Sequence, residues 1–111
     1  MDDDDRRARI RVLNDQLRTT GQGGQTMMTS TLAALEEAEL QRAIAAVREF
    51  KDFSPDNDPW GEHDCASLEM DGRRILWKID YYDPNLEFAS EDPADSTRTR
   101  RVLTIMLAED Y

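Results

Sequence analysis

The chain has one cysteine, four prolines and no long hydrophobic run. Because Cys65 has no second cysteine to pair with, an intramolecular disulfide is excluded, and a small chain without one is typical of a reducing compartment. The longest apolar stretch, residues 102–108, is interrupted by Thr104 and is far shorter than the roughly 20 residues that a membrane-spanning helix needs. These absences predict a cytoplasmic protein that does not enter a membrane.

Positive charge is also scarce, with 14 Lys and Arg against 24 Asp and Glu and a net charge of −10. Affinity for a nucleic-acid backbone comes from cations that neutralise phosphates, so direct binding to DNA or RNA is not expected. Twelve of the acidic residues lie between positions 53 and 95, where the basic residues are Arg73, Arg74 and Lys78. The same segment holds Trp60, Trp77, Tyr81, Tyr82 and Phe88. Carboxylates mixed with aromatic rings favour a surface for a cation or a basic protein.

A chain of 111 residues is long enough for one small core and too short for two. The acidic run at residues 1–5 has no apolar partner, and we expect a disordered tail there. Residues 6–111 are then a single domain.

The spacing of apolar residues predicts the first elements of this domain. Ile10, Leu13 and Leu17 recur every three or four residues, which is typical of one face of an amphipathic helix. Glycines at 21, 23 and 24 end that helix, and a strand is expected over 25–29. A second helix is expected over 36–51, where strong helix formers surround an apolar stripe from Leu40 to Phe50.

The second half of the chain predicts a hairpin followed by a helix. Alternating apolar residues on both sides of Asp71 and Gly72 indicate two strands joined by a two-residue turn. Asp92 and Pro93 resemble the start of a helix that would bury residues 102–107. The predicted fold is α+β, a small three-stranded antiparallel sheet packed with three helices in the order α-β-α-β-β-α.

The loop from residue 53 to 64 gathers oxygen ligands around the only histidine. Its candidate metal ligands are Asp56, Asp58, Glu62, His63 and Asp64. The spacing fails as a calcium-binding EF-hand, because Trp60 and Ser67 occupy positions that require ligands. The alternative is that these residues cap turns beside the prolines and that His63 bonds to backbone. No other cofactor is predicted.

A second set of residues predicts a binding surface for another protein. Large aromatic side chains with a polar tip, placed among carboxylates, are suited to recognition. The candidate partner-binding residues are Trp60, Tyr82, Asp83, Glu87, Glu91 and Asp92.

Four strings carry a resemblance to a known family: IRVLNDQLRTTG at 10–21, FSPDNDPWGEHD at 53–64, WKIDYYDPNLEFASEDPAD at 77–95 and RRVLTIMLAEDY at 100–111. Together they resemble the domain of unknown function numbered 3768, in which an NDxxR motif corresponds to Asn14, Asp15 and Arg18. The family consists of short, mostly alphaproteobacterial proteins that are often plasmid-borne. The resemblance implies a bacterial cytoplasmic setting and no particular activity, ligand or catalytic residue.

The charge pattern favours a binding protein over an enzyme. We expect a small acidic module that binds a basic or nucleic-acid-binding protein, as inhibitors of bacterial defence proteins do by mimicking nucleic acid, of the anti-restriction or anti-CRISPR type. The alternative is a small metal-dependent or acid-base enzyme centred on the loop from Asp56 to Asp64. The sequence leaves the oligomeric state open.

Overall fold

The computed structural model describes residues 2–111. Within these residues, three α-helices, four strands and one short 3-10 helix follow one another. Their bounds are α1 Asp3–Thr20, β1 Gln25–Met28, α2 Ser30–Ala33, α3 Glu37–Glu49, β2 Cys65–Met70, β3 Arg73–Tyr82, β4 Arg100–Leu107 and η1 Ala108–Asp110.

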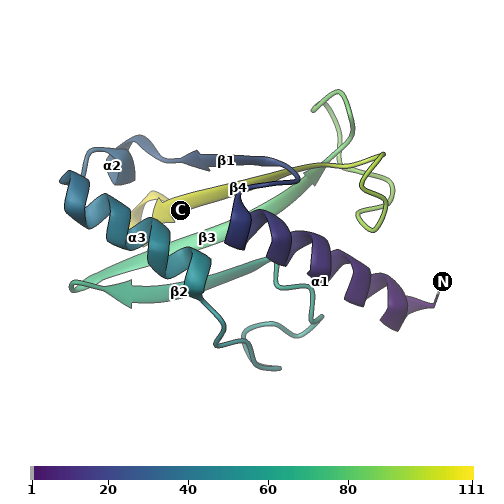
Figure 1. Ribbon diagram of the computed structural model, residues 1–111, viewed down its shortest axis with the longest axis horizontal. Coiled ribbons are helices and arrows are strands. Elements are labelled where there is room, and N and C mark those ends of the chain that lie inside the picture. The colour runs from purple at the N-terminus through teal and green to yellow at the C-terminus, as the bar shows by residue number, and fades with distance from the viewer. Residues whose placement is uncertain (1) are drawn as a thin grey trace.

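The strands form one mixed sheet in the order β1-β4-β3-β2 (Figure 1). β2 and β3 are the expected hairpin, and its turn residues Asp71 and Gly72 both have positive φ, as a tight two-residue turn requires. β3 continues antiparallel to β4, while β1 lies parallel to β4 on its other side. The α+β class agrees with the prediction, but the three-stranded antiparallel sheet and the order α-β-α-β-β-α are wrong, since the sheet has a fourth strand and the third helix is the short α2.

The fourth strand replaces the helix expected after Asp92 and Pro93. Residues 102–107 form β4, a central strand with neighbours on both sides. Such a strand is buried on both faces and therefore has a continuous apolar run, which periodicity alone does not distinguish from a buried helix. Asp92 instead accepts the backbone N–H of Ala94 and begins a turn.

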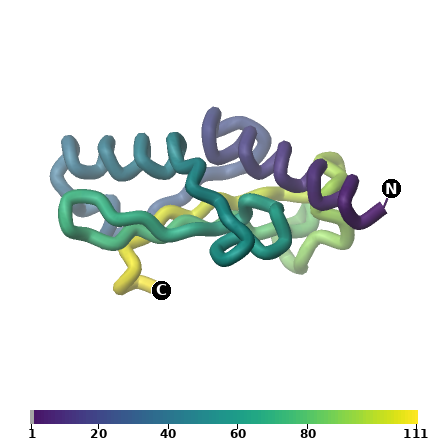
Figure 2. Tube along the Cα trace, turned by 90° about the horizontal axis from the view of Figure 1, so that it is seen from below, coloured from purple at the N-terminus to yellow at the C-terminus, as the bar shows by residue number. Residues whose placement is uncertain are grey.

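Helices α1 and α3 lie on the same side of the sheet (Figure 2). The sheet presents Ile75, Trp77 and Ile79 to them, together with Leu103 and Ile105 from the paired positions of β4. Trp77 is 1% exposed and lies at the centre of this core, as its alternation with Ile75 and Ile79 predicts. By the register of β3 and β4, Val102 and Met106 belong to the opposite face of the sheet.

The acidic N-terminal run begins α1. Asp2 caps this helix by accepting the backbone N–H of Asp5 at 2.8 Å. Asp3, Asp4 and Asp5 form the first turn, where carboxylates interact favourably with the helix dipole. Residues 2–5 are thus part of a helix where a disordered tail was expected, and Met1 is outside the described residues.

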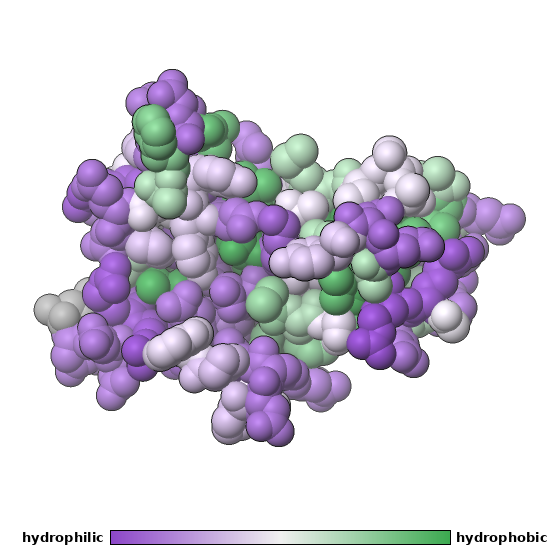
Figure 3. Space-filling view, turned by 180° about the vertical axis from the view of Figure 1, so that it is seen from behind, coloured by the Kyte–Doolittle hydropathy of each residue, from purple (hydrophilic) through white to green (hydrophobic). Residues whose placement is uncertain are grey.

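Neither α1 nor α3 covers the other face of the sheet, on whose side the C-terminal segment with η1 lies (Figure 2). Figure 3 views the molecule from that side, where green hydrophobic patches lie among purple hydrophilic residues. Among residues 2–111, no helix combines the length and the apolar character needed to cross a membrane.

Candidate functional site

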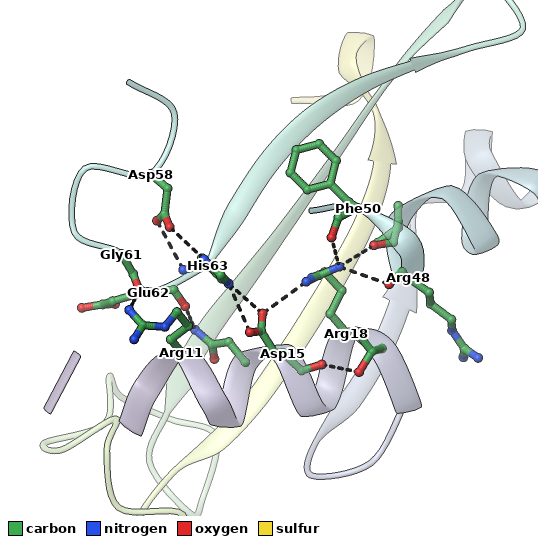
Figure 4. Close-up of polar contacts among 12 residues, drawn as sticks. Arg11, Asp15, Arg18, Arg48, Phe50, Asp58, Gly61, Glu62 and His63 are labelled. Atoms are coloured by element: carbon green, nitrogen blue, oxygen red, sulfur yellow. Dashed lines mark hydrogen bonds and ion pairs between the residues drawn. The ribbon is translucent and has the colours of Figure 1, made fainter. Parts of the chain in front are cut away.

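His63 lies between two carboxylates from different parts of the chain (Figure 4). Its Nδ1 is 2.9 Å from Oδ1 of Asp15 on α1, and its Nε2 is 3.5 Å from Oδ2 of Asp58 in its own loop. Phe53 stacks on the imidazole with the ring centroids 3.7 Å apart. Both ring nitrogens therefore face carboxylates, and the ring connects the loop to α1.

Arg18 extends this network from α1 to the end of α3. Its Nη1 donates to the carbonyl oxygens of Val47 and Phe50 at 2.9 and 2.8 Å, at the C-terminal end of α3. Its Nη2 lies 3.2 Å from Asp15 Oδ1, and its guanidinium stacks on Trp77 at 5.0 Å from the ring centroid. The carboxylate of Asp15 thus interacts with both His63 and Arg18.

A second buried cluster surrounds Asn14. Its Nδ2 donates to the hydroxyl of Tyr81 at 2.7 Å, and its Oδ1 accepts from Nε of Arg101 at 2.8 Å. The hydroxyl of Tyr81 donates in turn to Glu62 Oε1 at 3.1 Å. Burial, the largest cause, raises the pKa of Tyr81 well above its usual value and keeps the phenol protonated as a donor. The NDxxR residues therefore hold α1 against the sheet and the loop at 53–64.

The residues predicted to bind a metal are engaged separately. Asp58 faces His63 and Glu62 accepts from Tyr81, while Asp56 is exposed to solvent. Asp64 is half-buried, and burial is the main reason that its pKa is raised. Within residues 2–111, no three His, Cys, Asp or Glu side chains are grouped so that they could hold a metal ion.

Cys65 lies on the face of the sheet opposite Trp77, since it is paired with Lys78 while Ala66 is paired with Trp77. It lines a cavity of about 480 Å³ on the open face of the sheet, together with Leu76 and Met106. Partial burial raises the pKa of its thiol, which disfavours the nucleophilic thiolate. The arrangement around His63 thus has the hydrogen bonds of a structural network and no nucleophile beside the ring among the described residues.

Five of the six predicted partner-binding residues lie in or next to one segment, the acidic loop at residues 83–95. Tyr82 forms a bridge to Ala89, and Asp83 accepts the backbone N–H groups of Asn85 and Glu87. Asp92 pairs with Arg6 on α1 at 2.8 Å, and this hydrogen bond lowers the pKa of Asp92. Glu91 pairs with Arg98 at 2.5 Å, and Glu87 is exposed.

Trp60, the sixth predicted residue, lies in the other loop. Its side chain is 64% exposed, and the guanidinium of Arg7 lies 4.8 Å from its ring centroid. Arg6 and Arg7 are neighbours on α1, so Asp92 and Trp60 are both attached to the start of this helix. They belong to two adjoining surfaces, because each arginine contacts a different loop.

Two residues of the acidic loop were missed as binding candidates. Phe88 is 71% exposed and Leu86 is 45% exposed. Leu86 also has a φ of 60°, an uncommon and strained conformation for a leucine. The available signal was two large apolar residues in a stretch with no helical or strand periodicity. Such residues have no predicted core position and are candidates for contact with a partner.

A family model described as "Protein of unknown function (DUF3768)" matches residues 28–110. No curated protein matches the chain. No solved structure matches it either.

Proposed function

The chain belongs to the DUF3768 family of proteins of unknown function, and we propose that it is a protein-binding module that recognises a basic partner through its acidic loop. The exposed ring of Phe88 among carboxylates is the observation that carries this proposal. A large apolar side chain that is 71% exposed buries little surface in the fold, and such residues mark interaction sites when they form a patch.

The acidic loop combines the two parts of a protein interface. Phe88 and Leu86 provide an apolar centre, and a cavity of about 410 Å³ adjoins Phe88 and Glu91. Glu87 and Glu91 are exposed in the same loop and provide negative charge beside that centre. Interfaces of this kind obtain affinity from a few buried aromatic anchors, while the rim charges select the partner and accelerate encounter.

The loop is held in shape before a partner arrives. Asp83 bonds two backbone N–H groups within the loop, and Asp92 pairs with Arg6 on α1. Because Asp83 holds the backbone of the loop and Asp92 attaches the loop to α1, we assign these two carboxylates to positioning. Glu91 pairs with Arg98 but its side chain is 82% exposed, so it remains accessible to a partner. We assign partner contact to Phe88, Leu86, Glu87 and Glu91. A loop that is ordered in advance loses less conformational entropy on binding.

The chemistry of the loop favours a partner that normally binds nucleic acid. Residues 83–95 contain five carboxylates and no basic residue. A cationic groove that attracts phosphates also attracts carboxylates arranged on a rigid surface. In this role the chain competes with DNA or RNA for the groove and inhibits its partner.

The test is a comparison of two matched triple variants in affinity capture from bacterial extract. The loop variant combines Phe88→Ser, Glu87→Gln and Glu91→Gln. The control combines Val12→Ser, Glu36→Gln and Glu49→Gln, which removes one exposed apolar residue and two charges elsewhere on the surface. A protein retained by the wild type is then purified, and its affinity for each form is measured by calorimetry.

We expect the loop variant to bind the purified partner at least tenfold more weakly, since an aromatic anchor and two charges are lost together. The control should bind like the wild type. Raising the salt concentration and adding a short DNA duplex should both weaken the complex. Equal binding by the wild type and the loop variant, or binding that is indifferent to salt and DNA, contradicts the proposal.

A further inference from the structure

Another cavity, which shares Pro84 with the cavity beside Phe88, lies where the turn after α1 meets the segment before β4. Its volume is about 370 Å³. A water molecule occupies roughly 30 Å³, so a cavity of this volume can hold a small polar group that belongs to a larger molecule. Lining residues that bear on its chemistry are Gly23, Gly24, Ser96, Thr97, Arg100 and Arg101. In Figure 1 the turn between α1 and β1 lies beside the start of β4.

The cavity has positive charge in a protein of net charge −10. Neither Arg100 nor Arg101 forms an ion pair with any described residue, whereas Arg98, two positions earlier, pairs with Glu91. Arg101 is buried, and its hydrogen bonds go to two neutral acceptors, Oδ1 of Asn14 and the carbonyl oxygen of Pro93. Its charge is therefore not cancelled by its hydrogen-bond partners.

The turn after α1 adds backbone donors to this charge. Neither the N–H of Gly23 nor that of Gly24 donates to an acceptor within residues 2–111. Gly23 has a φ of 92°, and a Cβ on Gly24 would lie 2.4 Å from the carbonyl oxygen of Arg101. The fold thus requires glycine at both positions. As a result, no side chain covers the backbone of Gly23 and Gly24 where they line the cavity. Consecutive free N–H groups in a turn form a concave site for anions.

Hydroxyl groups complete the lining. Ser96 is exposed, while Thr97 Oγ1 donates to Asp95 and Thr99 Oγ1 donates to the carbonyl oxygen of Asp92. The described lining includes no aspartate or glutamate, although carboxylates are the commonest charged groups of the chain. A guanidinium group and a free backbone N–H can only donate hydrogen bonds, and a hydroxyl group can donate one. These donors match the acceptor oxygens of a phosphate.

We propose that this cavity binds the phosphate group of a small phosphorylated ligand, with Arg100 as the principal cation and the amides of Gly23 and Gly24 as donors. This proposal does not depend on protein binding by the acidic loop, although Pro84 of that loop lines the cavity. A free phosphate ion and a phosphate ester offer the same oxygens, so both are probes of the site.

The test is titration of the folded chain by NMR, with the amide signals of Gly23, Gly24 and Thr97 as reporters. Inorganic phosphate is added at constant ionic strength, with chloride exchanged for phosphate. Parallel titrations use adenosine monophosphate and adenosine. The variants are Arg100→Gln and, as the control, Arg73→Gln, which removes one positive charge at the far end of β3.

We expect saturable shifts of the three reporters with phosphate and with adenosine monophosphate. The Arg100→Gln variant should bind each roughly tenfold more weakly, since one charge-assisted hydrogen bond is lost. The Arg73→Gln control should match the wild type, and the spectra themselves show whether each variant is folded. The proposal is overturned if phosphate produces no saturable shift, if Arg100→Gln binds like Arg73→Gln, or if adenosine alone shifts the reporters as strongly as its monophosphate.

Discussion

Asn14, Asp15 and Arg18 each connect α1 to a different part of the molecule. Asn14 reaches Tyr81 and Arg101, Asp15 reaches His63, and Arg18 reaches the carbonyls at the end of α3. The spacing of Asp15 and Arg18 predicts the ion pair that they form. Their contacts with the loop and with α3 depend on tertiary packing, which spacing does not report.

The same limit applies to the predicted metal loop. The sequence places four carboxylates and a histidine close together along the chain, and proximity in sequence favours a shared ligand. In the structure, Asp58 and Glu62 have partners in different networks, His63 and Tyr81. The partner that decides the role of His63 is Asp15, which is 48 residues away. A contact between residues so far apart along the chain cannot be predicted from a local sequence motif.

Asp64 offers a test of buried charge at the level of one residue. Burial raises the pKa of this carboxyl in the folded state, so the folded protein holds its proton to higher pH than the unfolded chain does. Stability contributed by Asp64 is therefore present at low pH and is lost as the pH rises from the unfolded pKa through the folded one. We expect Asp64→Asn to raise the Tm by a few degrees at pH 7 and to leave it nearly unchanged at pH 3.

Thermal unfolding of both proteins, followed by circular dichroism between pH 3 and pH 8, measures this difference. Asp56→Asn is the matched control, because Asp56 is exposed in the same loop. A gain for Asp64→Asn that is equal at both ends of the pH range would show that its charge is not the cause.

At the scale of elements, the sequence predicted those parts whose signal is local. Helix α1, helix α3 and the β2–β3 hairpin follow from periodicity, glycine turns and the Asp71-Gly72 pair. The helix predicted over residues 102–107 was wrong, because these residues form β4 through pairing with β3 and β1, which are separate segments of the chain. Only that pairing makes residues 102–107 a buried strand, so its apolar run was ambiguous until the sheet was known.

The β1–β4 pair depends on Gly24. A methyl group at this position would lie 2.4 Å from the backbone oxygen of Arg101 and 2.9 Å from Leu17. A backbone oxygen cannot move aside without separating the strands, so we expect Gly24→Ala to destabilise the fold by roughly 1–3 kcal/mol, the usual cost of overpacking. Denaturant unfolding measures this loss.

Hydrogen exchange distinguishes loss of the pair from general destabilisation. The N–H of Thr29 donates to the carbonyl oxygen of Ile105 at 3.1 Å, at the end of the β1–β4 pair. Gly24→Ala should accelerate exchange of this amide by more than that of Ile79, which lies in β3. Gly72→Ala is the control, since its own strain at a φ of 76° lies in the hairpin turn. Uniform acceleration in both variants would contradict a specific role for Gly24.

At the scale of the whole molecule, charge opposes compactness. The net charge is −10 and the molecule extends 44 × 32 × 23 Å, so in low salt, where the Debye length is about 30 Å at 0.01 M, like charges repel one another across much of the surface. The ion pairs that offset this repulsion lie mostly at the surface. Arg42 with Asp71 and Arg74 with Glu69 are both largely exposed, and pairs of this kind contribute about 0–1 kcal/mol each.

Repulsion and surface pairing predict opposite responses to salt. Unfolding separates the like charges, so screening of a repulsive surface stabilises the folded state, whereas screening of attractive pairs destabilises it. Because the excess of carboxylates is large and the pairs are weak, we expect the Tm to rise as sodium chloride is increased from low to physiological concentration.

A variant with Glu36, Glu49, Glu87 and Glu91 changed to Gln should have a higher Tm in low salt and a smaller rise of the Tm with added salt. Scanning calorimetry over a series of sodium chloride concentrations measures the Tm of both proteins and its rise with salt. Sodium sulfate is not used, because it strengthens hydrophobic burial independently of charge. A Tm that falls with added salt would show that the ion pairs outweigh the repulsion, and the acidic surface would then be a source of stability in the free protein.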